Sequence, residues 1–241
     1  MMRLEGKRVL LTGGSDGIGQ ELARQLAAKG AQVTVTGRSP TKLATMATEG
    51  FATIEADFSH SGGVDAVVNT WGDAPLDILV NNAGMGRDHD FRKGATNPSD
   101  VEANILANLT APILLGVRLH ENLKRGSEPM IVNVTSGLAI TPSASAPLYC
   151  ATKAGLRSYS IGVREQLRES GIHVLEALPP MVDTQMTEGR EGKKLTVAQC
   201  ASEIVDAIEK RREEALVGMV KTLKRIHSIS PKLAQRILLR F

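Results

Sequence analysis

Short apolar runs alternate with longer amphipathic segments along most of the chain. The short runs end at residues such as glycine, asparagine, serine or proline, which is typical of buried strands. Seven segments have this character: residues 7–13, 31–37, 52–57, 77–84, 130–136, 172–178 and 214–218. Apolar positions at helical spacing fill the gaps, most extensively at 99–124, 147–169 and 196–212.

This alternation predicts the fold class. Strands separated by helices of about ten or more residues form βαβ units and a parallel sheet. Right-handed crossovers then place helices on both faces of the sheet. Because no repeat or linker interrupts the pattern, we expect residues 1–218 to form one Rossmann-like, doubly wound α/β domain with about seven strands. Ligands of such sheets bind at the carboxyl ends of the strands, where Gly13, Asn82, Ser136 and Pro180 lie.

Residues 219–241 differ from the rest of the chain. They contain six basic residues and no acidic one, whereas the net charge of +3 for the whole chain leaves −3 for residues 1–218. The pattern predicts two short amphipathic helices that meet at Ser230-Pro231, since serine suits an N-cap and proline the first helical position. We interpret this segment as a C-terminal helical extension rather than a second domain. It docks on its own domain or a partner subunit, or it contacts a membrane surface peripherally.

Composition narrows the class of protein. The chain has 241 residues, of which 42% are hydrophobic and 23% charged, as is usual for a globular protein. Cys150 and Cys200 lack the spacing of metal ligands, so we expect reduced thiols, no metal site and a cytoplasmic location. No apolar stretch predicts a secretory signal or a membrane span. The slightly acidic body also argues against nucleic-acid binding.

A glycine-rich loop follows the first predicted strand. Glycines at positions 13, 14, 17 and 19 separate this strand from the first helix. Glycine in this place lets the backbone approach a pyrophosphate, whose charge is favoured by the helix N-terminus. The alternative is an ordinary tight turn. Its placement after the first strand of a parallel sheet favours a dinucleotide site.

The chain has only two tyrosines, and one of them, Tyr149, stands four residues before Lys153. Positions i and i+4 share a helix face, so the amine is expected to lie beside the phenol. The ordinary pKa of a phenol is about 10, and a nearby cation lowers it. A catalytic acid works best when its pKa is near the working pH. Such a pair suits acid–base chemistry, and the alternative is an ordinary surface or core tyrosine near a solvated lysine.

Four motifs in order resemble the short-chain dehydrogenase/reductase family. They are the Gly-x-x-x-Gly-x-Gly spacing, the NNAG sequence at 81–84, Ser136, and the Tyr149-x-x-x-Lys153 pair thirteen residues after that serine. The resemblance runs from about residue 6 to residue 218. It implies an NAD(P)-dependent oxidoreductase that interconverts a small-molecule carbonyl and a secondary alcohol by hydride transfer. Tyr149 would be the general acid/base, Ser136 would hydrogen-bond the carbonyl oxygen, and Lys153 would also hold the nicotinamide ribose.

Asn108 is a fourth catalytic candidate. Pro112 stands four residues later and lacks an N–H, so the carbonyl of Asn108 loses its helical partner. The resemblance implies a helix asparagine that holds a water linked to the active-site lysine, and Asn108 is placed to do so. The alternative is that Pro112 only kinks the helix. Asn104 is the rival position, one turn earlier.

The second predicted strand bears on the choice of cofactor. Gly37 stands where an acid would select NAD, and Arg38 follows it, where it would bind a 2′-phosphate. Ser15 offers a further hydroxyl, although Asp16 places a negative charge in the same loop. We expect NADP, with NAD as the alternative. The residues predicted for cofactor binding are Gly13, Ser15, Asp16, Gly17, Ile18, Gly19, Arg38, Asp57, Asn82, Ala83, Gly84, Tyr149, Lys153, Pro179, Val182 and Thr184.

Two loops are candidates for the substrate side. Residues 184–194 are charged and contain glycine, as a mobile lid does, and residues 84–94 form the other loop. His89 in the second loop is interpreted as polar surface rather than as a catalytic group. Pro179-Pro180 stands where the family usually has Pro-Gly, which stiffens the turn and removes a donor. Neither loop identifies the substrate.

The resemblance also implies assembly. Helices over 104–124 and 150–168 would pair in a homodimer, and residues 196–218 would add a second interface in a homotetramer. The alternative to an enzyme is a catalytically silent protein with the same fold, either a dinucleotide-binding regulator or a membrane-surface protein.

Overall fold

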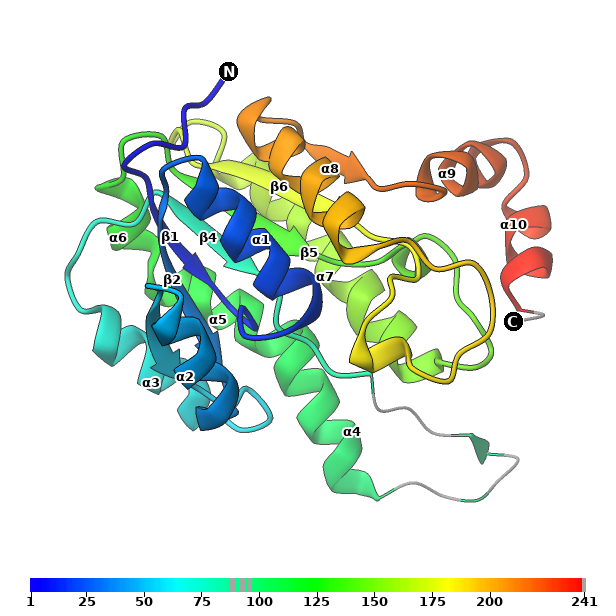
Figure 1. The fold of residues 1–241 in the computed structure, drawn as a ribbon. Helices are drawn as coiled ribbons and strands as arrows, with labels where there is room; N and C mark the ends of the chain where they lie inside the picture. Colours follow the sequence, from blue (N-terminus) through cyan, green and yellow to red (C-terminus); the bar gives the residue numbers. More distant parts are fainter. Residues whose placement is uncertain (87–89, 92–93, 95–96, 240–241) are drawn as a thin grey trace.

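A seven-stranded parallel sheet forms the centre of the described part of the molecule (Figure 1). The computed structural model describes residues 1–86, 90–91, 94 and 97–239. Its strands are β1 (Arg8–Leu11), β2 (Gln32–Gly37), β3 (Ala52–Glu55), β4 (Ile78–Asn81), β5 (Met130–Val134), β6 (His173–Leu178) and β7 (Glu214–Leu216). Their order is β3-β2-β1-β4-β5-β6-β7. This confirms the doubly wound α/β fold predicted from the alternating pattern.

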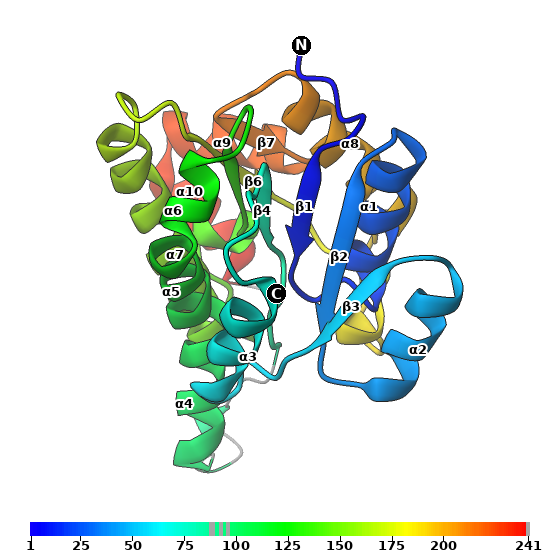
Figure 2. The same cartoon turned by 90° about the vertical axis from the view of Figure 1, so that its left-hand side faces the viewer.

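Helices cover both faces of the sheet (Figure 2). One layer contains α1 (Gly17–Ala28), α2 (Pro40–Thr48) and α8 (Val197–Glu209), and the other contains α3 (Gly62–Trp71), α4 (Pro98–Ile105), α5 (Ala111–Arg118), α6 (His120–Lys124) and α7 (Pro147–Gln166). Alternate residues of a strand point to opposite faces. In β1, Val9 and Leu11 therefore enter the core beneath α1 and α8, while Leu10 enters the core beneath α3 and α5.

The chain order reverses between β1 and β4, and this reversal positions the site. β2 and β3 lie on one side of β1, and β4 to β7 lie on the other. The loops that leave the carboxyl ends of β1 and β4 therefore diverge, which opens the crevice where doubly wound folds bind ligands.

The tail has two helices, α9 (Val220–Ile229) and α10 (Pro231–Leu238). Ser230 lies between them, and its side chain accepts a hydrogen bond from the Leu233 N–H at 3.3 Å, which caps α10. Val220 and Ala234 are buried, so one side of the tail packs on the molecule. In the described residues, no helix is both long and apolar enough to cross a bilayer.

Candidate active site

A cleft of about 610 Å³ lies at the carboxyl ends of the central strands. All the residues predicted for cofactor binding line this cleft, and Ser136 does so too. Asn108 lies behind the wall of the cleft and is fully buried. The fold thus brings the separate sequence motifs to one place. Among the described residues, no group of three His, Cys, Asp or Glu side chains is placed to hold a metal ion.

The glycine loop presents bare backbone to the cleft. A Cβ on Gly19 would lie 2.1 Å from the Gly13 carbonyl oxygen and 2.4 Å from Nδ2 of Asn82. Asn82 in turn donates from Nδ2 to the carbonyls of Thr12 and Gly13, at 3.0 and 3.1 Å. No side chain fits at position 19, and α1 begins directly behind the loop. This is the arrangement that a pyrophosphate requires, so the loop fits a dinucleotide.

The end of β2 presents Gly37 in place of an acidic side chain, with Ser15 beside it. A Cβ on Gly37 would lie 2.4 Å from Oγ of Ser15. Arg38, the next residue, is exposed and lines the same part of the cleft. A serine hydroxyl and a guanidinium therefore occupy the place where an NAD-selecting carboxylate would stand. This chemistry suits a 2′-phosphate.

The negative charge of Asp16 has local partners. Its side chain caps α1 by accepting a hydrogen bond from the Gly17 N–H at 2.8 Å. It also forms an ion pair with Nζ of Lys42 on α2. Lys42 donates to Oε1 of Gln185 at 3.0 Å as well, and both side chains line the cleft. Lys42 thus compensates the charge of Asp16 close to the expected position of the phosphate.

Sequence reasoning did not select Lys42. Ser39 accepts a hydrogen bond from the Lys42 N–H and caps α2, so Lys42 lies in the first turn of that helix. The sequence did contain a signal for Lys42. Ser39-Pro40 marks the start of a helix directly after β2, so a residue in the first turn of that helix lies close to the carboxyl end of β2.

Asp57 lies after β3 and is held as a carboxylate. Burial raises the pKa of Asp57, but hydrogen bonds from Ser59 and the charges of Arg38 and His60 outweigh this effect, so its pKa lies below the ordinary value. One of those hydrogen bonds joins the Ser59 N–H to Oδ1 of Asp57 at 2.9 Å. An ionised acceptor at this position is available to a donor group of a ligand.

Tyr149 and Lys153 lie in the N-terminal half of α7, as predicted. Nζ of Lys153 is 5.7 Å from the centre of the Tyr149 ring and donates to the Val134 carbonyl at 2.8 Å. Ser136 follows β5, and its side chain forms a hydrogen bond with Tyr149. It also accepts a hydrogen bond from the Leu138 N–H at 3.1 Å. The three polar groups therefore converge on one side of the cleft.

The pKa of Tyr149 departs from the sequence-based expectation. Burial raises the pKa of its phenol, while the hydrogen bond with Ser136 and the charge of Arg190 act in the opposite direction. We expected Lys153 to lower the phenol pKa, but Lys153 is itself buried and its own pKa falls to about 8. Desolvation was the missing factor, since it disfavours the charged form of both groups.

The buried amine predicts a dependence of stability on pH. The folded-state pKa of Lys153 is about 8, below its ordinary value of 10.5. Between these values the unfolded chain binds the proton and the folded chain does not, so the free energy of unfolding rises with pH. We expect it to rise by about 2 kcal/mol more for the wild type than for Lys153→Met from pH 8 to about pH 10.

Urea denaturation at both pH values measures this difference. Lys124→Met removes an exposed lysine and is the matched control, which should follow the wild type. Identical pH dependence in wild type and Lys153→Met would contradict the expectation.

Asn108 connects the cleft to α7. Its Oδ1 accepts from the Met85 N–H at 2.7 Å, and its Nδ2 donates to the Met85 carbonyl at 2.9 Å. Nδ2 also contacts Oδ1 of Asn104 at 2.7 Å and Oγ1 of Thr152 at 3.2 Å. Thr152 directly precedes Lys153. The Asn108 side chain thus connects the loop after β4 to α7, and the rival residue Asn104 belongs to the same group of contacts.

The helix around Asn108 is irregular. Residues Leu106–Thr110 form a π turn, and the Ala111 N–H donates to the carbonyl of Leu106, five residues earlier. Pro112 follows immediately and has no N–H to donate. The sequence predicted a disturbance before this proline, and the structure gives it the form of a π turn rather than a simple kink.

Two loops meet over the cleft. Residues Gln185–Thr187 form a single 3-10 turn, capped by Thr184. A Cβ on Gly86 would lie 2.8 Å from Cγ of Met186, so the predicted lid touches the loop after β4. His89 lies outside the described residues. The Pro179 carbonyl accepts the Gly137 N–H at 2.8 Å, which fixes the Pro-Pro turn against the segment after Ser136.

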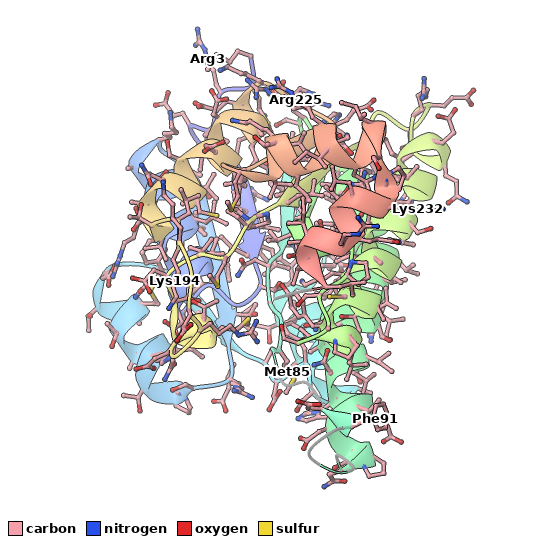
Figure 3. All side chains as sticks on the ribbon, turned by 90° about the vertical axis from the view of Figure 1, so that its right-hand side faces the viewer. Arg3, Met85, Phe91, Lys194, Arg225 and Lys232 are labelled. Carbon is pink, nitrogen blue, oxygen red and sulfur yellow. The ribbon has the colours of Figure 1, made fainter. Side chains whose placement is uncertain are left out.

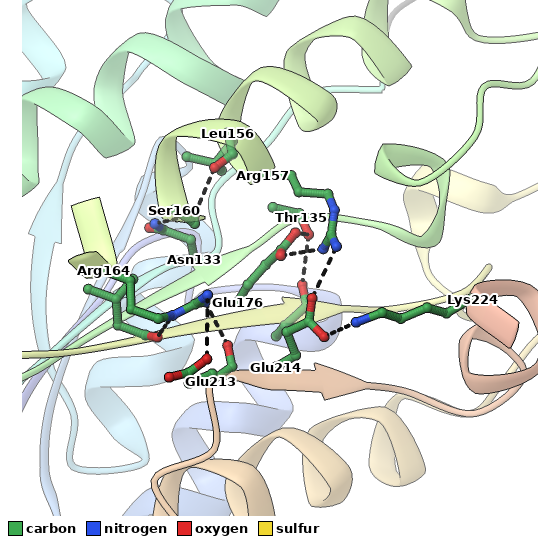
Figure 4. A network of polar contacts seen from close by, with 12 residues as sticks. Asn133, Thr135, Leu156, Arg157, Ser160, Arg164, Glu176, Glu213, Glu214 and Lys224 are labelled. Atoms are coloured by element: carbon green, nitrogen blue, oxygen red, sulfur yellow. Dashed lines mark hydrogen bonds and ion pairs between the residues drawn. The ribbon is translucent and has the colours of Figure 1, made fainter. Parts of the chain in front are cut away.

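A buried ionic network supports the residues behind Ser136 (Figure 4). Glu176 on β6 is fully buried, accepts a hydrogen bond from Oγ1 of Thr135 at 2.7 Å and pairs with Arg157 of α7. Arg157 also contacts Glu214 at 3.0 Å, and Glu214 pairs with Lys224 of α9. The network links α7, the segment after β5, the strands β6 and β7, and the tail. Removing one partner would leave a buried charge uncompensated, which is costly.

Comparison with known proteins identifies the family. The chain matches the short chain dehydrogenase family over residues 7–195. The protein belongs to the short-chain dehydrogenases. This membership, together with the cleft, supports an oxidoreductase that uses NAD or NADP.

Relatives of this short-chain dehydrogenase cover nearly its whole length. The uncharacterized oxidoreductase DltE of Bacillus subtilis is 36% identical over 234 residues, which are 92% of each protein. A short chain dehydrogenase of Burkholderia cenocepacia in complex with NADP shares the fold, with a TM-score of 0.88 over 99% of both chains at 24% identity. A second from that organism, also in complex with NADP, is 28% identical, with a TM-score of 0.73 over 88% of this chain and 96% of its own.

Proposed function

We propose that this short-chain dehydrogenase is an NADP-dependent enzyme that interconverts a carbonyl and a secondary alcohol. The observation that carries the proposal is the convergence of Ser136, Tyr149 and Lys153 on the cleft that the glycine loop also lines. The Tyr149 phenol and the Ser136 hydroxyl lie on one wall of the cleft, where the first can donate a proton to a carbonyl oxygen and the second can donate a hydrogen bond to it. Bound NADPH would supply the hydride.

Each polar residue of the site has a distinct task in this proposal. Tyr149 donates its phenolic proton to the carbonyl oxygen, and Ser136 donates a hydrogen bond to the same oxygen. Lys153 binds ribose hydroxyls, and its charge favours the phenolate that forms. Asn108 holds the Met85 backbone and the side chain of Thr152 in place. Because Thr152 directly precedes Lys153, this contact helps to position the lysine.

Two observations favour NADP over NAD. Because the last residue of β2 is Gly37, no side-chain carboxylate at this position accepts a ribose 2′-hydroxyl, and the Ser15 hydroxyl lies beside it. Arg38 stands next to this position, and Lys42 offsets the charge of Asp16. The two Burkholderia proteins in complex with NADP are consistent with this preference.

A panel of ketones, aldehydes and alcohols with NADPH or NADP tests the proposal. Oxidation of NADPH by at least one carbonyl, or reduction of NADP by one alcohol, is expected. The alternative is a catalytically silent dinucleotide-binding protein. Tight NADPH binding with no turnover across the panel would favour that alternative.

Exposed apolar residues predict a homodimer. Ile105 and Leu114 on α4 and α5, together with Ile161 on α7, are each more than a third exposed, and Val117 is 61% exposed. These helices lie in the layer opposite α1 and α8. We expect this face to pair with the same face of a second copy, as in isologous dimers.

Light scattering at micromolar concentration measures the assembly. Val117→Glu and Ile161→Glu should shift the protein toward monomer, because each buries a charge in the interface. Ala47→Glu on the exposed side of α2 is the matched control and should leave the mass unchanged. A monomeric wild type would contradict the dimer.

A further inference from the structure

The tail presents basic and apolar side chains on its outer side. Figure 3 shows the molecule from the side on which α9 and α10 lie, with Arg225 and Lys232 labelled. Ile229 is 87% exposed, Leu233 47% and Ile237 37%. With Arg225, Lys232 and Arg236, these three residues form what we call the tail surface.

The inner side of the tail is fixed to the domain. Val220 and Ala234 are buried, Lys221 pairs with Glu203 at 2.9 Å, and Lys224 pairs with Glu214. Helix α9 therefore packs on the domain, and α10 packs on α9. These contacts use the residues of one side and leave the tail surface outside.

The charges of the tail surface are uncompensated. Residues 219–241 contain no acidic residue. Within the part of the chain that the structure describes, Arg225, Lys232 and Arg236 have no ion-pair partner, whereas Lys221 and Lys224 do. Exposed apolar groups beside unpaired cations suit an occupant that is both apolar and anionic.

We propose that the tail surface binds the surface of an anionic lipid bilayer. A basic amphipathic helix buries its apolar side chains at the boundary of headgroups and acyl chains, while its cations contact lipid phosphates. The ten residues of α9 and the eight of α10 are too few to span a membrane. Peripheral attachment is therefore the mode that their length and charge permit.

A second copy of this chain fits the tail surface poorly. An isologous contact brings the same patch of both subunits together. Such a contact would bring two copies of the same cationic cluster, Arg225, Lys232 and Arg236, into one interface, where they repel. An anionic bilayer offers the opposite charge over the whole surface.

Vesicle sedimentation tests this proposal with the full-length protein. The wild type should bind vesicles of phosphatidylglycerol and phosphatidylcholine in equal amounts, and not vesicles of phosphatidylcholine alone. Lys232→Gln combined with Arg236→Gln should lower the partition coefficient by about twenty-five-fold, since each basic residue near the surface contributes about five-fold. Leu233→Ser combined with Ile237→Ser should also lower it, because less apolar surface enters the bilayer.

Arg3→Gln combined with Lys210→Gln is the matched control. Both residues are exposed, and this change removes the same charge at positions outside the tail, so it should leave binding within about two-fold of the wild type. Circular dichroism confirms that each variant is folded. Absent binding to the anionic vesicles, or an equal loss in the control and tail variants, would overturn the proposal. Tail variants that change the mass in light scattering while vesicle binding stays unchanged would assign the surface to a second copy and overturn it too.

Discussion

Replacement of Tyr149 by phenylalanine is expected to reduce turnover by about a hundred- to ten-thousand-fold, the usual contribution of a positioned general acid. The change removes only the hydroxyl, which forms a hydrogen bond with Ser136 at the cleft wall. The ring keeps its place beside Lys153. NADPH affinity, measured by fluorescence titration, should therefore stay within a few-fold of the wild type.

The chain supplies a matched control for this substitution. Tyr159, the other tyrosine, lies on the same helix α7 but does not line the cleft. Tyr159→Phe should keep nearly full turnover with the same carbonyl substrate. If Tyr149→Phe and Tyr159→Phe lose turnover equally, or if neither loses it, Tyr149 is not the acid.

Arg38→Ala is expected to weaken NADPH binding by about ten- to a hundred-fold, since a hydrogen bond to a charged group contributes about 1.5–3 kcal/mol. NADH lacks the 2′-phosphate, so its affinity should change little. Isothermal titration of both cofactors measures the two effects in one series. The ratio of the losses is the informative quantity, because a general disturbance of β2 would weaken both cofactors alike.

Arg24→Ala serves as the control for Arg38→Ala. Arg24 lies on α1, pairs with Glu49 at 2.6 Å and does not line the cleft. The Arg24→Ala substitution removes the same kind of charge from the same side of the sheet. Equal losses for NADPH and NADH in Arg38→Ala would mean that Arg38 does not bind the 2′-phosphate.

The periodic parts of the molecule were predictable from the sequence. Each of the seven predicted strand segments contains one observed strand, because a buried parallel strand needs a short apolar run and a stop signal. The capping residues Ser39 and Ser230 were also predictable, since each precedes a proline at the start of a helix. The cleft followed from motifs that stand just after strands.

Properties that depend on packing were not predictable in the same way. The direction in which the pKa of Tyr149 shifts depends on how deeply the phenol and Lys153 are buried. The i, i+4 spacing of the two residues carries no information on burial. The ion pair between Asp16 and Lys42 joins the N-cap of α1 to the first turn of α2. Local sequence patterns do not report such distant pairs. From the sequence alone, the charge of Asp16 therefore looked unfavourable for binding a 2′-phosphate, and only the structure shows that Lys42 compensates it.

The contact between Gly137 and the tail has a consequence for how the sequence can change. A Cβ on Gly137 would lie 2.9 Å from Cγ2 of Val220, and Gly137 directly follows Ser136. A methyl group added at position 137 would therefore force the Val220 side chain to shift or to become smaller, so we expect the residue at position 220 to limit the choice of residue at position 137. Exchange of tails between relatives would place a different residue against the segment that carries Ser136, and we expect such chimeras to need a matching change at position 137.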